Sequence, residues 1–121
     1  KIFVKLKNNE GFPDGSCIDN DHSLWNAQYN GSCVQEFKED GSYGNKIYIP
    51  CPQVTCVCIG GKNLDVVFIT TAKENWTSEL DTKYPLAGSI FYAKLNLFSN
   101  AKGRKINMFD DKLIDYSKVI E

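Results

Sequence analysis

Short runs of apolar residues, rich in β-branched and aromatic side chains, alternate along the chain with clusters of turn-forming residues. Runs of this length bounded by Gly, Asn and Asp are typical of β-strands. The pattern predicts strands at residues 2–7, 16–19, 24–28, 32–37, 46–49, 54–59, 66–70, 89–95 and 105–109. No segment before residue 109 has the apolar spacing of a helix longer than one turn. The pattern therefore predicts an all-β fold.

Two of the predicted strand pairs repeat along the chain. Residues 17–19 correspond to 58–60, and residues 24–27 correspond to 67–70, at offsets of 41 and 43 residues. This spacing lies in the range of one four-stranded blade of a β-propeller. The repeat therefore indicates propeller blades, each a small sheet that packs on its neighbours.

The repeat divides the chain into two blade units, at about residues 15–50 and 54–109, followed by a polar tail at residues 110–121. A long loop through residues 73–86 extends the second unit. Because a blade buries its faces against its neighbours, two blades alone leave two large apolar flanks uncovered. We therefore expect either that further blades lie upstream of this chain or that several copies self-associate through their open flanks.

The charge of the chain is nearly balanced, with 14 basic and 15 acidic residues and a formal net charge of −1. No basic run provides the electrostatic footprint of a nucleic-acid-binding protein. No stretch reaches the ~18 consecutive apolar residues that a membrane-spanning helix needs. The sequence therefore predicts neither nucleic acid nor a membrane as a partner.

The five cysteines are an odd number, and three of them, Cys17, Cys56 and Cys58, lie in apolar strand-like runs. We expect mostly reduced cysteines in the core, which favours a cytoplasmic location. Two glycosylation acceptor triplets, beginning at Asn30 and Asn75, leave secretion open. A structural zinc site is not expected, because Cys56-x-Cys58 lacks the second ligand pair that such a site requires.

Three other polar segments have structural interpretations. His22 lies in the predicted turn at residues 20–22 and is expected to be exposed. Asp19, just before this turn, is expected to accept hydrogen bonds within it. Residues 60–63, GGKN, lack the spacing of a phosphate-binding loop and are expected to form a β-turn.

Residues 11–19, GFPDGSCID, followed by LW-x-A-x-YNG at residues 24–31, resemble the PDG-x-C-x-D…LW-x-A…NG segment of the gluconolactonase, regucalcin and luciferin-regenerating enzyme family. The second unit is similar to the family in the same order, with QVTC at residues 53–56, GGKNLD at 60–65 and AGSIF at 87–91. The resemblance implies about two blades from the C-terminal portion of a six-bladed β-propeller, incomplete as given. Asn26 departs from the family, which usually has an apolar residue at this position, and it needs a hydrogen-bond partner if its side chain points inward.

In that family a divalent cation on the propeller axis is held by a Glu of the first blade, Asn residues of middle blades and the Asp of the PDG motif. Only this last residue maps onto the chain, as Asp14, and the others would lie upstream of Lys1. The resemblance implies that Asp14 is a metal ligand and a catalytic base, since a carboxylate beside a cation can also take a proton. Oxygen and amide ligands suit calcium, magnesium or manganese, and zinc tolerates them. By itself, Pro13-Asp14-Gly15 is also a common turn sequence.

Two functions stay open. The first is the C-terminal part of a divalent-metal-dependent hydrolase that acts on a sugar lactone or a related ester, with a cation that polarises the carbonyl group. The second is a truncated, non-catalytic relative that binds a metal or a partner through its open blade flanks. Because most of the family's ligands are absent from residues 1–121, the sequence leaves open whether this chain is an enzyme.

Overall fold

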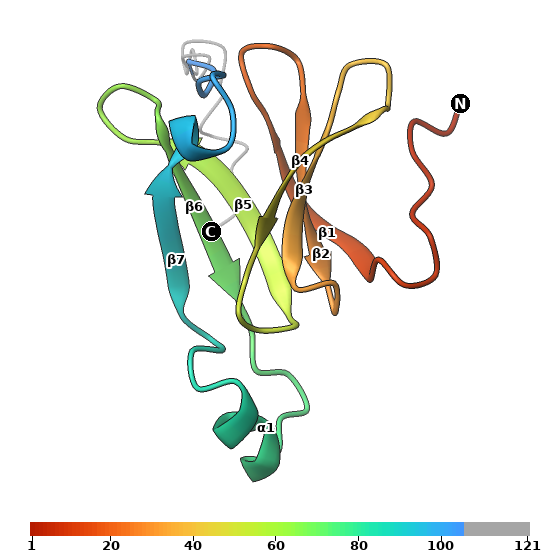
Figure 1. The fold of residues 1–121 in the computed structure, drawn as a ribbon, viewed down its shortest axis with the longest axis vertical. Helices are drawn as coiled ribbons and strands as arrows, with labels where there is room; N and C mark the ends of the chain where they lie inside the picture. Colours follow the sequence, from red (N-terminus) through yellow and green to blue (C-terminus); the bar gives the residue numbers. More distant parts are fainter. Residues whose placement is uncertain (106–121) are drawn as a thin grey trace, which may run out of the picture.

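The computed structural model describes residues 1–105, whose seven strands form two packed antiparallel sheets (Figure 1). The first sheet has the strand order β1-β2-β3-β4 and the second has the order β5-β6-β7. The strands are β1 (Phe12–Ile18), β2 (Leu24–Tyr29), β3 (Cys33–Phe37), β4 (Tyr43–Tyr48), β5 (Val54–Gly60), β6 (Val66–Thr71) and β7 (Ile90–Lys94). The helical elements are α1 (Ser78–Lys83) and a 3-10 turn at Leu95–Leu97. The all-β prediction is confirmed.

The strand register places the repeated residues in equivalent positions. Cys17 lies opposite Trp25 in the first sheet, and Cys58 lies opposite Phe68 in the second. The repeat therefore corresponds to the first hairpin of each sheet. The last four residues of the predicted second unit, 106–109, and the predicted tail at residues 110–121 lie outside the described residues.

The strand predicted at residues 2–7 is not formed. This segment follows the outer face of the first sheet, at the right of Figure 1, without joining it. The side chains of this segment still alternate in burial: Val4 and Leu6 are half-buried, whereas Lys5 and Lys7 are exposed. The prediction was wrong because a strand needs a neighbouring strand as well as the correct pattern, and residues 1–105 supply none here.

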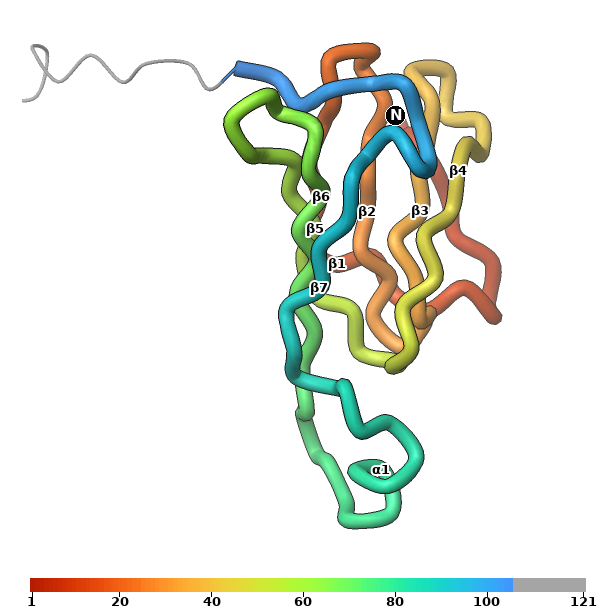
Figure 2. Tube along the Cα trace, turned by 60° about the vertical axis from the view of Figure 1, so that its left-hand side comes forward, coloured from red at the N-terminus to blue at the C-terminus, as the bar shows by residue number. Residues whose placement is uncertain are grey.

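The prediction that no helix is longer than one turn was also wrong. Helix α1 has six residues and lies in the loop predicted at residues 73–86, which projects beyond the ends of both sheets (Figure 2). The hydroxyl group of Thr77 caps its N-terminus by accepting a hydrogen bond from the Leu80 backbone N–H, and Lys83 lies in its last turn. No residue of α1 is buried, so it lacks the apolar stripe that would have indicated a helix. Within residues 1–105 no helix has the length and apolar character to span a membrane.

The core lies between the two sheets, where β5 packs against β1 and β2. Trp25 and Ala27 of β2 are fully buried and contact the second sheet's inner face. The other buried apolar residues of this cluster are Val34, Ile47, Ile49, Cys51, Val54, Val57, Val67, Ile69, Ala87 and Leu95. This core fixes the orientation of β1, the strand that carries Asp14.

A buried carboxylate anchors the first hairpin to this core. Asp19 is fully buried and accepts hydrogen bonds from the backbone N–H groups of Asp21 and Ser23, both at 2.9 Å. Its second oxygen accepts a 2.8 Å hydrogen bond from the indole Nε1 of Trp25. Asp19 therefore has the turn-acceptor role expected from the sequence, and it also orients the largest side chain of the core.

A second buried carboxylate, Glu36 of β3, ties β3 to β4. Its Oε2 accepts hydrogen bonds from the backbone N–H of Asn45, at 2.8 Å, and from the Asn45 side-chain amide, at 2.6 Å. Its Oε1 pairs with the Lys38 ammonium group. Burial raises the pKa of Glu36, but the hydrogen bonds from Lys38, Asn45 and Ser23 together bring the pKa below the ordinary value of 4.5.

We expect Glu36 to contribute to the pH dependence of stability. Because its pKa is lower in the folded than in the unfolded state, its contribution is complete above pH 4.5 and is lost as the pH falls through the folded-state pKa. Glu36→Gln should lower the free energy of unfolding by about 2 kcal/mol near neutral pH and reduce the loss on acidification. Urea denaturation at several pH values measures the free energy of unfolding and its dependence on pH. Glu79→Gln, a change at an exposed residue, is the control. A variant that loses stability on acidification as steeply as the wild type would contradict this role.

Candidate metal and substrate site

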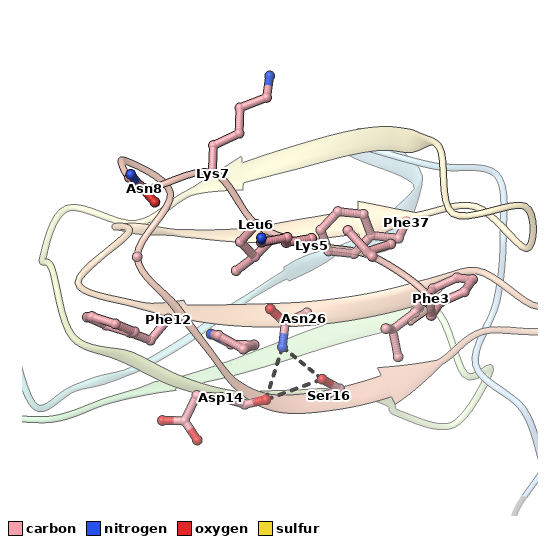
Figure 3. A pocket seen from close by; sticks show the side chains of 14 residues that line it. Phe3, Lys5, Leu6, Lys7, Asn8, Phe12, Asp14, Ser16, Asn26 and Phe37 are labelled. Atoms are coloured by element: carbon pink, nitrogen blue, oxygen red, sulfur yellow. Dashed lines mark hydrogen bonds between the residues drawn. The ribbon is translucent and has the colours of Figure 1, made fainter. Parts of the chain in front are cut away.

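Asp14 lies in an irregularity of strand β1. The pairing of β1 with β2 shifts between Pro13 and Ser16, as in a β-bulge, so two residues of β1 have no direct partner across the ladder. A bulge redirects a side chain and is often found beside functional sites. The Asp14 carboxylate is exposed and points away from the sheet face, as Figure 3 shows.

The backbone at Asp14 is held from the neighbouring strand by Asn26. The Asn26 Nδ2 donates to the carbonyl oxygen of Asp14 at 3.0 Å and to the Ser16 hydroxyl oxygen at 2.9 Å (Figure 3). The Ser16 hydroxyl in turn donates to the Asp14 carbonyl oxygen at 3.3 Å. Asn26, which departs from the family pattern, is buried on the face of the sheet opposite Trp25, and its amino group has partners there. Its Oδ1 is buried with no hydrogen-bond partner in residues 1–105.

Gly15 allows β1 to approach β5 directly beside Asp14. A Cβ atom placed on Gly15 would lie 2.8 Å from the Cα of Cys56 and 2.6 Å from its Sγ. Such distances are too short for any side chain. The glycine of the Pro13-Asp14-Gly15 sequence is therefore required by the contact between the two sheets.

A polar cluster, formed by Tyr29, Gln53 and Glu74, joins the two sheets at the end where β2 stops. The Tyr29 hydroxyl donates a 2.7 Å hydrogen bond to Glu74 Oε2. Gln53 holds the Glu74 backbone on both sides, donating to its carbonyl oxygen at 2.9 Å and accepting from its N–H at 2.7 Å. The hydrogen bond to Glu74 raises the pKa of Tyr29, and the negative charge of Asp14 acts in the same direction. The cluster therefore lies within electrostatic reach of Asp14.

The sequence did not indicate this cluster, although Tyr29 and Gln53 lie in segments that resemble the family. Glu74 is 45 residues from its hydroxyl partner and lies in a loop, so no local pattern could have connected them.

The described residues do not complete a metal site. Among residues 1–105, no group of three or more His, Cys, Asp or Glu side chains is arranged to hold a metal ion. A calcium ion takes six to eight oxygen ligands, and magnesium needs an octahedral set. Asp14 offers one carboxylate to such an ion, so these residues alone do not fit the full ligand set of a cation site.

The cysteines differ in part from the expectation of a buried set. Cys33 and Cys51 are buried, but Cys56 and Cys58 are exposed. Alternation along a strand does not reveal which of its two faces is covered. All five thiols are free. Burial raises the pKa of Cys17 to about 12, with further contributions from Cys58 and Cys56, so its thiol stays protonated at neutral pH.

Two other sequence expectations agree with the structure. His22 is exposed in the turn after β1 and lies 3.6 Å from the Glu39 carboxylate, in a solvent-exposed contact. Residues 61–64 form the turn between β5 and β6, and a backbone hydrogen bond from Leu64 N–H to the Gly61 carbonyl closes it. Neither segment belongs to the site around Asp14.

Two stacked antiparallel sheets, each a meander of sequential strands, agree with two neighbouring blades of a β-propeller. The structure matches the crystal structure of regucalcin, a calcium-binding protein from Agrobacterium tumefaciens, with a TM-score of 0.77 and 27% identity. The match covers 86% of this chain and 34% of that one. A luciferin-regenerating enzyme structure matches with a TM-score of 0.65 and 31% identity, over 79% of this chain and 31% of that one.

The family model described as "SMP-30/Gluconolactonase/LRE-like region" matches residues 1–73, and the chain belongs to this family. Among its relatives, 6-deoxy-6-sulfogluconolactonase of Pseudomonas putida is 33% identical over 72% of this chain and 30% of its own length. L-arabinolactonase of Azospirillum brasilense is 32% identical over 76% of this chain and 30% of its own. Regucalcin of Danio rerio is 35% identical over 75% of this chain and 31% of its own length. The chain thus spans about a third of the length of these relatives. The family resemblance inferred from the sequence motifs is confirmed.

Proposed function

We propose that this chain is part of a hydrolase of sugar lactones or related esters, to whose divalent-cation site it contributes Asp14. The observation that carries the proposal is the Asp14 carboxylate, which is exposed on a bulge whose backbone is fixed by Asn26 and Ser16. Two of the relatives named above are lactonases, which supports the substrate class. Calcium, manganese, magnesium and zinc all accept carboxylate oxygen.

A bound cation would polarise the lactone carbonyl and acidify a water molecule. The residues of this chain have a separate task. The hydrogen bond from Asn26 holds the backbone carbonyl of Asp14, and the exposed Asp14 carboxylate can accept a proton. Gly15 brings the second sheet close beside it. With its five thiols free, we place the protein in the cytoplasm, where thiols remain reduced.

A second candidate function is a non-catalytic binding module. It is favoured by the absence of any group of three metal-ligating side chains among residues 1–105. Such a module would bind a metal weakly through Asp14, or a partner through its open flanks.

Hydrolysis of gluconolactone by the purified chain distinguishes these functions. We expect slow turnover above the spontaneous rate that requires added calcium, manganese or zinc, because a single carboxylate leaves most of the coordination positions of the ion to water. Asp14→Asn should return the rate to the spontaneous background, whereas the exposed turn variant Asp21→Asn should leave it unchanged. A chain that is folded by circular dichroism and shows no cation-dependent turnover would contradict hydrolysis by these residues alone, and would leave the binding module or a hydrolase whose other metal ligands lie outside this chain.

A further inference from the structure

We propose that Glu74 is a specificity-determining residue, which favours neutral lactones rich in hydroxyl groups over lactones that carry an anionic substituent. This inference rests on the proposed function, because it places Glu74 at the rim of the site to which Asp14 belongs. The polar cluster of Tyr29, Gln53 and Glu74 holds the carboxylate of Glu74 in place. Its position, its attachment to both sheets and its charge support this role.

Glu74 lies at the same end of the two sheets as Asp14. At this end β1 begins, and its first residue, Phe12, pairs with Tyr29, the last residue of β2. An isolated bridge between Tyr29 and Gln53 joins the two sheets there. The loop of α1, which starts close to Glu74, leaves the second sheet at this end and projects beyond it (Figure 2). The Asp14 bulge and the start of this loop therefore belong to the same end of the structure.

Hydrogen bonds from both sheets fix the start of this loop. The side chain of Gln53 accepts a 2.7 Å hydrogen bond from the Glu74 backbone N–H and donates a 2.9 Å hydrogen bond to the Glu74 carbonyl oxygen. From the first sheet, the Tyr29 hydroxyl donates to the Glu74 carboxylate at 2.7 Å. Further along the loop, Trp76 and Tyr84 pack against the core. A carboxylate held by neighbours in this way is preorganised for a ligand.

The charge of Glu74 adds to the negative charge of Asp14 at this end. Among the described residues Glu74 is in no ion pair, and the ammonium group of its neighbour Lys73 pairs with Asp81 instead. The hydrogen bond to Glu74 raises the pKa of Tyr29, and the charges of Glu74 and Asp14 act in the same direction. The Tyr29 hydroxyl therefore lies in the field of both carboxylates. A cation at Asp14 would offset only one of these two charges.

The pair of Tyr29 and Glu74 offers a ligand acceptor atoms. The Tyr29 hydroxyl donates its proton to Glu74, so its oxygen has only lone pairs left for a ligand. An ionised carboxylate is also an acceptor without a donor. The hydroxyl groups of a sugar lactone are donors and match this pair. A phosphate or sulfonate substituent presents further acceptors and a like charge, which the Glu74 carboxylate repels.

The binding of two matched lactams to the purified chain tests this role. D-Gluconolactam is neutral, carries the hydroxyl groups of gluconolactone and has an amide in place of the hydrolysable ester. Its 6-phosphate differs only by the anionic group. In one buffer of fixed calcium concentration and ionic strength, we expect the neutral lactam to shift the NMR signals of the Glu74 backbone N–H and the Gln53 side-chain amide. Binding that leaves both signals unchanged, or no binding, would overturn the proposal.

Glu74→Gln removes the charge and retains the shape of the side chain. We expect the ratio of the affinity for the neutral lactam to the affinity for the 6-phosphate to fall about fivefold, as one unit charge lost near a protein surface can produce. Because the ratio compares two variants in the same buffer, the attraction of phosphate to calcium cancels. Glu79→Gln, the same change on α1, is the control and should leave the ratio unchanged. A ratio that Glu74→Gln does not lower, or that Glu79→Gln lowers equally, would overturn the proposal.

Tyr29→Phe separates the position of Glu74 from its charge. This variant removes the hydroxyl that orients the carboxylate and leaves the charge in place. We expect it to weaken the binding of both lactams about threefold, the loss of one neutral hydrogen bond, with an unchanged ratio of affinities. Wild-type affinity in this variant would overturn the role of Tyr29 in holding Glu74.

These measurements do not depend on hydrolysis, because the lactams are not turned over. A chain that fails to hydrolyse gluconolactone but shows the Glu74-dependent ratio would contradict hydrolysis by these residues and support the selection by Glu74. A chain that hydrolyses gluconolactone with a ratio independent of Glu74 would support the proposed function and overturn this inference.

Discussion

Replacing Trp25 by alanine is expected to lower the free energy of unfolding by about 4 kcal/mol. The indole group is fully buried between the two sheets and packs in the centre of the apolar cluster. Its removal leaves a cavity that the strands on either side cannot fill without losing their register. It also removes the Nε1 donor from the Asp19 carboxylate, which is itself fully buried. A buried acceptor that loses its donor adds to the cost of the cavity.

Guanidinium denaturation monitored by circular dichroism measures this effect. Trp76→Ala is the matched control, because the chain's other tryptophan is only half-buried and donates to the exposed Asp81 at 3.1 Å. We expect this control to cost about 1 kcal/mol, as is usual for a partly exposed side chain. Equal losses for the two tryptophans would show that the contact between the sheets is not the main source of stability.

Replacing Gly15 by alanine is expected to lower the free energy of unfolding by about 2 kcal/mol or more. The cause is overpacking, because the added methyl group has no space between the two sheets. The new methyl group would lie 2.8 Å from the Cα of Cys56 and 2.6 Å from its Sγ, so moving the Cys56 side chain alone would not remove the clash. The two sheets would have to separate at the position where Asp14 is presented. We therefore expect Gly15→Ala to reduce both stability and any cation-dependent lactone hydrolysis.

Gly60→Ala provides the control for this prediction. Gly60 lies on the same strand as Cys56, and a Cβ atom there would lie 3.5 Å from the Phe68 ring, an ordinary contact. We expect this variant to lose less than about 1 kcal/mol, the usual difference between Gly and Ala in regular structure. Urea denaturation measures the loss of unfolding free energy in each variant. The difference between Gly15→Ala and Gly60→Ala is the cost of the steric clash with Cys56. If Gly15→Ala were as stable as Gly60→Ala, the approach of β1 to β5 would be looser than the structure describes.

The strands of the two sheets could be predicted from sequence because the relevant signals are local. Alternating apolar residues and Gly or Asn turns define each hairpin, and antiparallel neighbours require only short connections. The same local signals gave wrong predictions where the secondary structure depends on a neighbouring strand or on a capping side chain. Residues 2–7 have a strand pattern but no strand beside them, and α1 is stabilised by its Thr77 cap without any apolar stripe.

The site could be predicted only in part. The sequence singled out Asp14 through a motif and Asn26 through its departure from that motif, but it did not indicate that the Asn26 amide holds the Asp14 carbonyl oxygen. That contact joins residues 12 positions apart across a bulge, and a bulge changes the register that simple alternation assumes. The cluster of Tyr29, Gln53 and Glu74 depends on how the two sheets are placed, which is a property of the assembled core.

The strand order described above also determines how the chain folds. Every strand in both sheets pairs with its neighbour in the sequence, so the loops to be closed are short except for the β6-β7 connection, and hairpins with short loops form in about 1–10 μs. The contacts of β5 with β1 and β2 are the ones that join distant parts of the sequence. Docking of the second sheet onto Trp25 should therefore be the rate-limiting step. A chain that has formed its hairpins but not yet docked them would expose its apolar faces, and this intermediate is where aggregation during folding would begin.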